Sequence, residues 1–228
     1  MYNRPNYKGF WKKWFEEKNL YEQINRPEIR YNTIRKYIKG KNVLDFGYGT
    51  GFFIKKLLQE GFNVTGIDFF KNIKVQKRKR LTLISLRNIN DLFLLSFKEK
   101  FDTIIASEVI EHLNKGETNK VLKFFYNWLS EDGKLIITVP YREKINIYKL
   151  LCPYCLKWFH PWLHKQAFDE ISIEKLLKKY GFVTEKISYI TFIEFINIPL
   201  FLRHFLNFII STFSLRGKIY IVTISKKE

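Results

Sequence analysis

The fold is decided by the stretch Val43-Leu44-Asp45-Phe46-Gly47-Tyr48-Gly49-Thr50-Gly51. Its apolar first half predicts a buried strand, and the glycines that follow predict a sharp turn into a helix. Because glycines let a ligand approach the backbone, the turn indicates a nucleotide-type ligand. A dinucleotide site spaces its glycines G-x-G-x-x-G, which would place the third glycine at Phe52. Phe52 is too large for the close packing required there, and this disfavours a dinucleotide.

On both sides of this stretch, short β-rich runs alternate with longer amphipathic ones, which is typical of βαβ units and a parallel sheet. Strands are predicted at Asn42–Phe46, Asn63–Asp68, Leu81–Leu86, Thr103–Ser107, Lys134–Val139, Val183–Ile190 and Lys218–Ser225. Helices are predicted at Gly51–Gln59, Asn72–Arg80, Glu117–Leu129 and Ile171–Lys179, with Gly61, Gly133 and Gly181 where helices should stop. We therefore expect a Rossmann-like α/β fold.

The chain has 228 residues, of which 46% are apolar, and this is enough for one sizeable core. We expect an N-terminal helical cap over residues 1–40 and one domain over residues 41–228. Two insertions interrupt this domain: a segment with both cysteines at residues 140–168, and an apolar helical segment at residues 191–213. The uncharged runs of the second are shorter than the roughly 20 residues that a membrane span needs. A lid, an interfacial helix and a plain core helix remain open for it.

The net charge of +18 would suggest an anionic partner, RNA or a membrane surface. The cations are spread along the chain, as a compositional bias would spread them, except at Lys71–Arg80. There a solvated helix face is weighed against contact with RNA or acidic lipid. Two cysteines cannot form a disulfide framework, and the first 31 residues do not read as a signal peptide. We expect a cytoplasmic protein, with peripheral membrane association as the alternative.

The glycine spacing D-x-G-x-G-x-G resembles motif I of the class I S-adenosylmethionine-dependent methyltransferases of the type 11 and type 12 kind. The resemblance extends from about Asn42 to Gly181. Within it, Phe101–Leu113 resembles the fourth-strand signature of the family, and Ser130–Leu135 resembles the turn into its fifth strand. The resemblance implies a three-layer sandwich with a mostly parallel seven-stranded sheet and an antiparallel last strand. It also implies S-adenosylmethionine as the cofactor.

In that family the glycine loop holds the methionine part of the cofactor, and an acidic residue ending the second strand binds both ribose hydroxyls. Asp68 matches the second position, and a carboxylate can accept from two vicinal hydroxyls at once. An acidic residue usually accepts from the adenine amino group, but Asn88 stands there, and Asp91 is the competing assignment. The predicted cofactor-binding residues are Asp45, Gly47, Tyr48, Gly49, Gly51, Asp68, Phe69, Asn88, Ser107 and Glu108.

Catalytic candidates gather after the predicted fourth strand, where Glu111 and His112 follow Glu108. The pattern Glu-x-x-Glu-His resembles the divalent-metal site of quinone-biosynthesis O-methyltransferases and of small-RNA 3′-terminal 2′-O-methyltransferases. Mg²⁺ or Mn²⁺ there would lower the pKa of a substrate hydroxyl; otherwise Glu111 and His112 shape the pocket. His164 begins an H-x-x-x-F stretch whose histidine faces the active site in many small-molecule methyltransferases. Glu111, His112 and His164 are the predicted catalytic residues.

A second metal site is predicted from Cys152, Cys155, His160 and His164. The spacing C-x2-C-x4-H-x3-H supplies four ligands that suit tetrahedral zinc stapling a loop without its own core. The alternative is two thiols and two unconnected histidines in a substrate-binding loop. His164 is contested between this zinc site and the active site.

The predicted function is methyl transfer to an oxygen or nitrogen of a small-molecule acceptor, lipid-like or sugar-containing in view of the aromatic and apolar additions. RNA methylation is the second hypothesis, supported by the charge and by Glu-x-x-Glu-His. The third is a non-catalytic, zinc-stapled module that binds a membrane surface or a partner protein.

Overall fold

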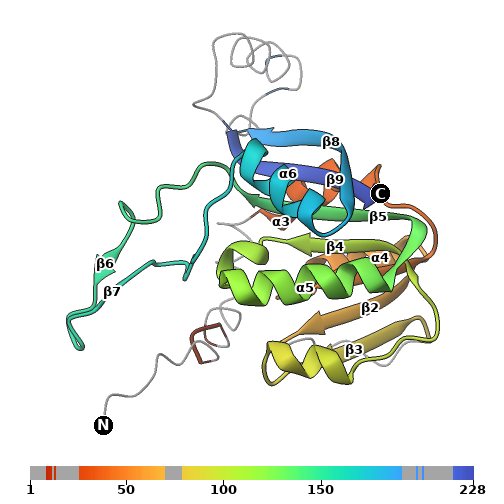
Figure 1. Cartoon of the computed structure of the whole chain (residues 1–228), viewed down its shortest axis with the longest axis horizontal. Coiled ribbons are helices and arrows are strands. Elements are labelled where there is room, and N and C mark those ends of the chain that lie inside the picture. Colours follow the sequence, from red (N-terminus) through yellow and green to blue (C-terminus); the bar gives the residue numbers. More distant parts are fainter. Residues whose placement is uncertain are drawn as a thin grey trace.

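The computed structural model describes residues 9–11, 13, 26–69, 79–191, 199, 202 and 218–228. They form a seven-stranded sheet in the order β3-β2-β1-β4-β5-β9-β8, with helices on both faces (Figure 1). The strands of this sheet are β1 (Asn42–Phe46), β2 (Asn63–Asp68), β3 (Leu81–Ser85), β4 (Phe101–Ser107), β5 (Leu129–Pro140), β8 (Phe182–Thr191) and β9 (Lys218–Lys227). The helices are α3 (Pro27–Arg35), α4 (Phe52–Gln59), α5 (Lys115–Trp128) and α6 (Glu170–Lys179), with short 3-10 helices η1 (Ile89–Leu94) and η2 (Ile110–His112).

The last strand runs against its neighbours. β9 pairs antiparallel with β5 on one side and with β8 on the other, while β1 pairs parallel with both β2 and β4. These pairings confirm the predicted mostly parallel sheet with an antiparallel last strand. The strand order changes direction between β1 and β4, and in such sheets the carboxyl ends at this point form the ligand crevice.

The sheet is the middle of three layers, and a separate hydrophobic core lies between it and the helices on each face. Alternate residues of one strand point to opposite faces, so Leu44 lies in the core under α5 and α6 whereas Val43 lies in the core under α3 and α4. Phe125 of α5 is fully buried in the first core, and Ile34 of α3 in the second. The described end of the expected N-terminal cap, helix α3, therefore packs on the sheet as part of the sandwich.

The predicted bounds of β1 and β2 agree with the structure, but the junction of α5 and β5 does not. The predicted stop at Gly133 is wrong, because α5 ends at Trp128 and Leu129 already has extended backbone, with φ −72° and ψ 139°. Leu129 is fully buried and pairs with Phe101 of β4, so burial favours strand there. The start of α5 is fixed earlier than predicted, by a capping box between Asn114 and Glu117.

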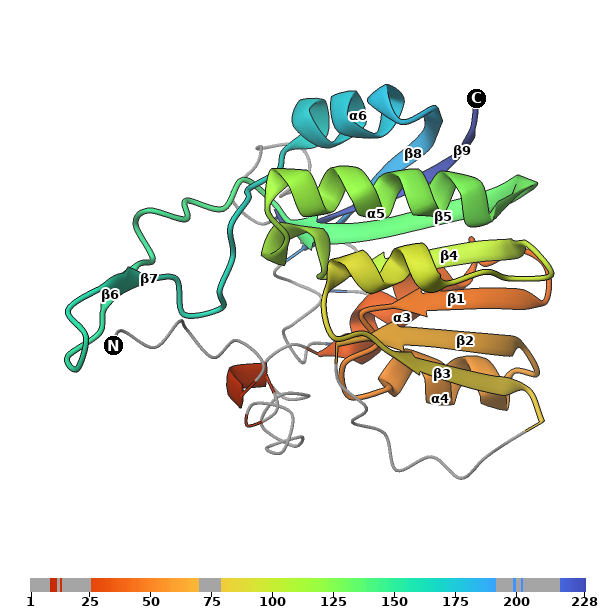
Figure 2. The same cartoon turned by 60° about the horizontal axis from the view of Figure 1, so that its bottom comes forward.

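The insertion at residues 140–168 leaves the sheet and returns to it. Tyr141 and Phe168 form a bridge, and Arg142 N donates to Phe168 O at 2.8 Å, so the excursion is closed at its base. Beyond the base it forms a two-stranded hairpin of β6 (Leu150–Leu151) and β7 (Trp158–Phe159). Figure 2 shows this hairpin standing out from the body of the molecule.

Several predicted segments lie outside the described residues. They are most of the helix predicted at residues 72–80, whose last two residues form a turn, most of the apolar segment at residues 191–213, and most of the cap before residue 26. In the part of the chain that the structure describes, no helix is long and apolar enough to cross a membrane.

Candidate active site

A cavity of about 1130 Å³ lies at the carboxyl ends of β1, β2 and β4. This is slightly larger than the roughly 300–1,000 Å³ of most ligand pockets, so a cofactor and an acceptor fit together. The predicted site residues on its wall are Gly47, Gly49, Asp68, Phe69, Asn88, Ser107, Glu108, Glu111, His112 and His164. Asp45, Tyr48 and Gly51 lie behind the wall, where they support the loop.

The glycine loop is held in a conformation that requires glycine. Gly47 has φ +77°, and a Cβ atom there would lie 2.4 Å from Val109 Cγ2. Gly49 N donates to Asp68 Oδ2 at 2.8 Å, which fixes the loop against the end of β2. Gly51, with φ +76°, is the N-cap of α4 and lets the chain turn from the loop into the helix.

Asp45 is a buried acid at the start of the glycine loop. It is 3% exposed, and its Oδ2 has no hydrogen-bond partner among the described residues. Burial, and then the charge of Asp68, raise the pKa of Asp45 to about 8. A cation beside Asp45 would stabilise its ionised form. Asp68 already accepts from Gly49 N, yet a carboxylate has further acceptor sites for two vicinal hydroxyls.

At the far end of the cavity, Asn88 and Asp91 have different surroundings. Asn88 lies on the wall as the N-cap of η1, where its Oδ1 accepts from Asn90 N at 2.8 Å. Asp91 is not on the wall and is engaged by Arg87, whose backbone N donates to Asp91 Oδ2 at 2.7 Å. The geometry favours Asn88 over Asp91 as the contact for a base.

Glu108 is held by hydrogen bonds from the neighbouring strand. Thr138 Oγ1 donates to Glu108 Oε1 at 2.8 Å and lies 2.8 Å from Ser107 Oγ. Glu108 has φ +56°, a conformation that costs energy for a residue with a side chain and that clusters at functional sites. Burial raises the pKa of Glu108, and the positive charge of Arg30 acts against this rise.

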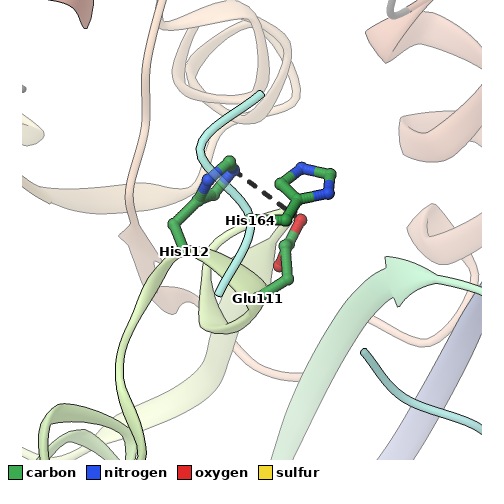
Figure 3. A group of neighbouring side chains, drawn as sticks. All are labelled: Glu111, His112 and His164. Carbon is green, nitrogen blue, oxygen red and sulfur yellow. Dashed lines mark ion pairs between the residues drawn. The ribbon is translucent and has the colours of Figure 1, made fainter. Parts of the chain in front are cut away.

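Glu111 and His112 both come from η2 and face each other in the cavity (Figure 3). Glu111 is fully buried, and neither of its carboxylate oxygens has a hydrogen-bond partner among the described residues. Burial, and then the charge of Glu108, raise the pKa of Glu111 well above its usual range. Burial, and then His164, lower the pKa of His112 to about 3. His112 is therefore neutral at physiological pH, and Glu111 favours its protonated form.

The segment after the hairpin is tied to η2. Lys165 N and Gln166 N donate to the carbonyl oxygen of Glu111 at 2.7 and 3.1 Å, and Gln166 Nε2 donates to Leu113 O at 2.8 Å. These bonds bring the imidazole of His164 to 4.7 Å, centroid to centroid, from that of His112. The structure thus brings together all three predicted catalytic residues.

Glu143, which the sequence analysis did not predict, is the partner of His164. Its Oε2 is hydrogen-bonded to His164 Nδ1, and its Oε1 lies 3.5 Å from His160 Nε2. The two imidazoles stack, with centroids 4.8 Å apart and planes inclined by 20°. The carboxylate and the stacked ring together fix the orientation of His164.

The predicted zinc set of Cys152, Cys155, His160 and His164 is not assembled. Among the described residues, two sets of three candidate ligands have their ligand atoms within 4.8 Å of one another, and neither includes a cysteine. These sets are Glu111 with His112 and His164, and Glu143 with His160 and His164. The cysteines lie instead in the turn of the hairpin, where Cys152 N donates to Lys157 O at 2.9 Å. The hairpin separates the thiols from the two histidines, of which His164 lies on the cavity wall and His160 stacks on His164.

Three further residues that shape the site were not found from the sequence. Thr138 and Glu143 come from the end of β5 and the loop after it, so their position at a carboxyl edge was an available signal. Arg30 comes from α3 and is 3% exposed. A buried arginine in a segment that looks like a surface cap has no sequence signal.

The chain matches the methyltransferase domain family over residues 22–187. It belongs to this family. The order of its strands and the glycine loop after β1 agree with the Rossmann-like methyltransferase fold.

Two curated relatives and one solved structure show how far the similarity extends. An uncharacterized methyltransferase of Alkaliphilus oremlandii is 31% identical over 128 residues, which cover 54% of this chain and 58% of that protein. The mitochondrial ubiquinone biosynthesis O-methyltransferase of Bos taurus is 30% identical over 160 residues, which cover 59% of this chain and 42% of that protein. The methyltransferase thus spans about half the length of the curated relatives it matches.

The crystal structure of a SAM-dependent methyltransferase from Archaeoglobus fulgidus has the same fold, with a TM-score of 0.63 and 22% identity. The superposition covers 92% of this chain and all of that one. At this identity the likeness establishes the fold.

Proposed function

We propose that this methyltransferase transfers a methyl group from S-adenosylmethionine to an oxygen or nitrogen of a small-molecule acceptor. The observation that carries the proposal is one cavity in which the glycine loop and Asp68, with Asp45 directly behind them, lie beside a histidine oriented by a carboxylate. A cofactor and an acceptor can therefore meet in a single cavity.

The residues of the loop fit the cofactor. Gly47 and Gly49 leave the backbone open to a ligand, and Asp45 supplies a buried oxygen without a partner in the described chain, which suits the ammonium group of the methionine part. Asp68 suits the ribose hydroxyls, and Asn88 the base. When bound, S-adenosylmethionine supplies a methyl group already activated on a sulfonium, so the protein mainly aligns the acceptor and excludes water.

His164 is the group that takes a proton from the acceptor. In the tautomer with a proton on Nδ1, His164 donates to Glu143 Oε2 and leaves Nε2 to accept a second proton. The positive charge that then forms on the ring lies against Glu143. Glu143 is accordingly a positioning residue, and Glu111 and His112 form the neutral wall beside the ring.

The direct test is incubation of the purified protein with isotopically labelled S-adenosylmethionine and a small-molecule extract, followed by mass spectrometry of labelled products. The proposal requires a labelled product that is lost with His164→Ala while the affinity for S-adenosylhomocysteine is kept. Labelled product that persists in His164→Ala would exclude His164 as the base.

A specific observation favours a second version of this chemistry. Both carboxylate oxygens of Glu111 lack partners among the described residues, and the ligand atoms of Glu111, His112 and His164 lie within 4.8 Å of one another. These residues would hold a divalent cation such as Mg²⁺ or Mn²⁺, which would polarise an acceptor hydroxyl. In that case His164 is a ligand and Glu143 orients it. Metal analysis of the full chain, with Glu111→Gln as the comparison, separates the two versions.

RNA methylation is a different candidate function, and the net charge of +18 favours it. RNA binding weakens steeply as salt rises, because phosphate contacts release counterions. Binding of RNA that falls by orders of magnitude between low and high salt, together with labelled RNA product, would replace the small-molecule proposal.

A further inference from the structure

The hairpin of β6 and β7 concentrates the exposed apolar surface of the described chain. We call residues 147–159 the apolar hairpin. Of the thirteen large apolar side chains that are exposed among the described residues, eight lie in it. They are Ile147, Tyr148, Leu150, Leu151, Tyr154, Leu156, Trp158 and Phe159. Contiguous apolar surface of this kind marks an interaction site.

Both faces of the ribbon are apolar. Neighbouring residues of a strand point to opposite faces, and the neighbours Leu150 and Leu151 are 53% and 46% exposed, while Trp158 and Phe159 are 66% and 38% exposed. A partner protein seated on one face would leave the other in water. A lipid interface surrounds an inserted ribbon and covers both faces together.

The charges and the aromatic residues of the segment select the kind of lipid. No aspartate or glutamate occurs between residues 144 and 168, whereas lysines stand at 144, 149, 157 and 165. Lysine is attracted to anionic headgroups, and its long stem lets the ammonium reach them from an apolar surface. Tyr154 at the tip and Trp158 belong to the residue types that are enriched at the boundary between lipid and water.

The apolar hairpin is continuous with the cavity. Ile147, Tyr148 and Leu150 lie on the cavity wall together with Glu143 and His164. The ring of Tyr148 also meets that of His160 edge to face, with centroids 6.4 Å apart. A surface bound by the hairpin would therefore lie beside the entrance to the proposed active site.

We propose that the apolar hairpin docks the methyltransferase onto an anionic lipid bilayer, inserting its tip among the headgroups. The docking itself is independent of catalysis. The consequence that acceptors reach the cavity from the bilayer rests on the proposed function.

Flotation of the full chain with vesicles tests the docking. Vesicles of phosphatidylcholine alone are compared with vesicles that also contain phosphatidylglycerol, and the protein is expected to float with the second kind. Leu156→Ser with Trp158→Ser should reduce the bound fraction at least about tenfold, since each side chain loses its burial in lipid. The matched control is Phe93→Ser with Leu94→Ser, because these side chains on η1 are equally exposed, at 66% and 74% against 72% and 66%.

The charge is tested separately. Lys149→Glu with Lys157→Glu should abolish the preference for phosphatidylglycerol, whereas Lys115→Glu with Lys123→Glu, an equal change of charge elsewhere, should weaken it only slightly. Equal losses in the hairpin and control variants, or a wild-type protein that does not float, would overturn the proposal. Self-association that is lost in the hairpin variant, without vesicle binding in the wild type, would assign the hairpin to a second copy instead.

Calorimetry with S-adenosylhomocysteine keeps the two proposals distinguishable. The hairpin variant should bind it with the affinity of the wild type, which shows that the fold is kept. If the wild type floats but binds no S-adenosylhomocysteine, the proposed function fails and the docking stands. If it binds S-adenosylhomocysteine but does not float, the docking fails.

Discussion

Asp45→Asn should make the protein without cofactor more stable and its cofactor binding weaker. Asp45 is buried, and its pKa rises from 3.8 to about 8 on folding. Each pH unit between the two pKa values corresponds to about 1.4 kcal/mol. Relative to a carboxyl whose pKa does not change on folding, Asp45 therefore lowers the free energy of unfolding by about 6 kcal/mol at alkaline pH, where it is ionised, and by about 4 kcal/mol at pH 7, where the folded chain keeps its proton.

The direction with pH follows from the protons bound in each state. Between about pH 4 and pH 8 the unfolded chain has released the proton of Asp45 while the folded chain keeps it. The free energy of unfolding therefore falls as pH rises through this window. The stability that protonated Asp45 contributes is fully present only below about pH 4 and is lost as pH rises to about 8. The asparagine of the variant does not titrate, so the advantage of the variant over the wild type should grow by about 4 kcal/mol between pH 5 and pH 8.

The measurement is urea unfolding of both proteins at pH 5, 6, 7 and 8 without cofactor. Glu108 and Glu111 also have raised pKa values, and their effects cancel in the difference between the two proteins. Asp132→Asn, at an exposed position of β5, is the control and should change the difference little. A difference between wild type and Asp45→Asn that stays constant from pH 5 to pH 8 would refute the reasoning.

The same variant should bind S-adenosylhomocysteine roughly 10- to 100-fold more weakly, because a buried hydrogen bond to a charged group contributes about 1.5–3 kcal/mol. Calorimetry at pH 7.5 checks this. Stability and affinity thus change in opposite directions at one residue. Unchanged affinity would mean that the ammonium group of the cofactor does not lie against Asp45.

Three further substitutions test the frame of the site. Gly47→Ala, which meets Val109 at 2.4 Å with φ +77°, should cost at least about 2 kcal/mol in urea unfolding, and a smaller loss would show that Val109 can move away. Asn88→Ala should lower the free energy of unfolding by about 1 kcal/mol, because the cap of η1 is lost, and should weaken S-adenosylhomocysteine binding. Asn88→Asp should keep both the stability and the affinity. Equal affinities of the two variants would remove Asn88 from the adenine site. Gln166→Leu removes the hydrogen bonds that Gln166 Nε2 donates to Leu113 O and Thr118 Oγ1, and it should lower the free energy of unfolding by about 2–3 kcal/mol. A loss near zero in urea unfolding would contradict the role of Gln166 in fixing His164.

The parts of the fold that were predicted well depend on local chemistry. β1 and β2 have the predicted bounds because an apolar run ends in both cases at residues that only a turn or an edge tolerates, Gly47 and Asp68. The α5–β5 junction was predicted wrongly because its glycine, Gly133, lies inside a strand that pairing with β4 extends back to Leu129. Tertiary pairing overrides a local stop signal there.

The site divides along the same line. Glu111, His112 and His164, which stand in recognisable patterns, lie together on the cavity wall. Glu143 stands in no such pattern and becomes a partner of His164 only through the closed base of the insertion. The predicted zinc set is not assembled for a related reason. The spacing of residues along a chain limits how far apart their side chains can lie, but the path of the hairpin determines which of them come into contact. Cys152 and His160 lie eight residues apart in the sequence, and β7 leads from the turn with the cysteines back to the cavity.

Net charge is the property for which sequence and structure give the most different information. A value of +18 averages over the whole chain and predicts anionic partners in general. The cavity has a different balance: five acids line it, Asp68, Glu108, Glu111, Glu117 and Glu143, together with four basic residues, Arg87, Arg142, Lys144 and Lys165. The net charge therefore bears on what the protein attracts from a distance, and the ligand inside the cavity has to be argued from the individual side chains that line it.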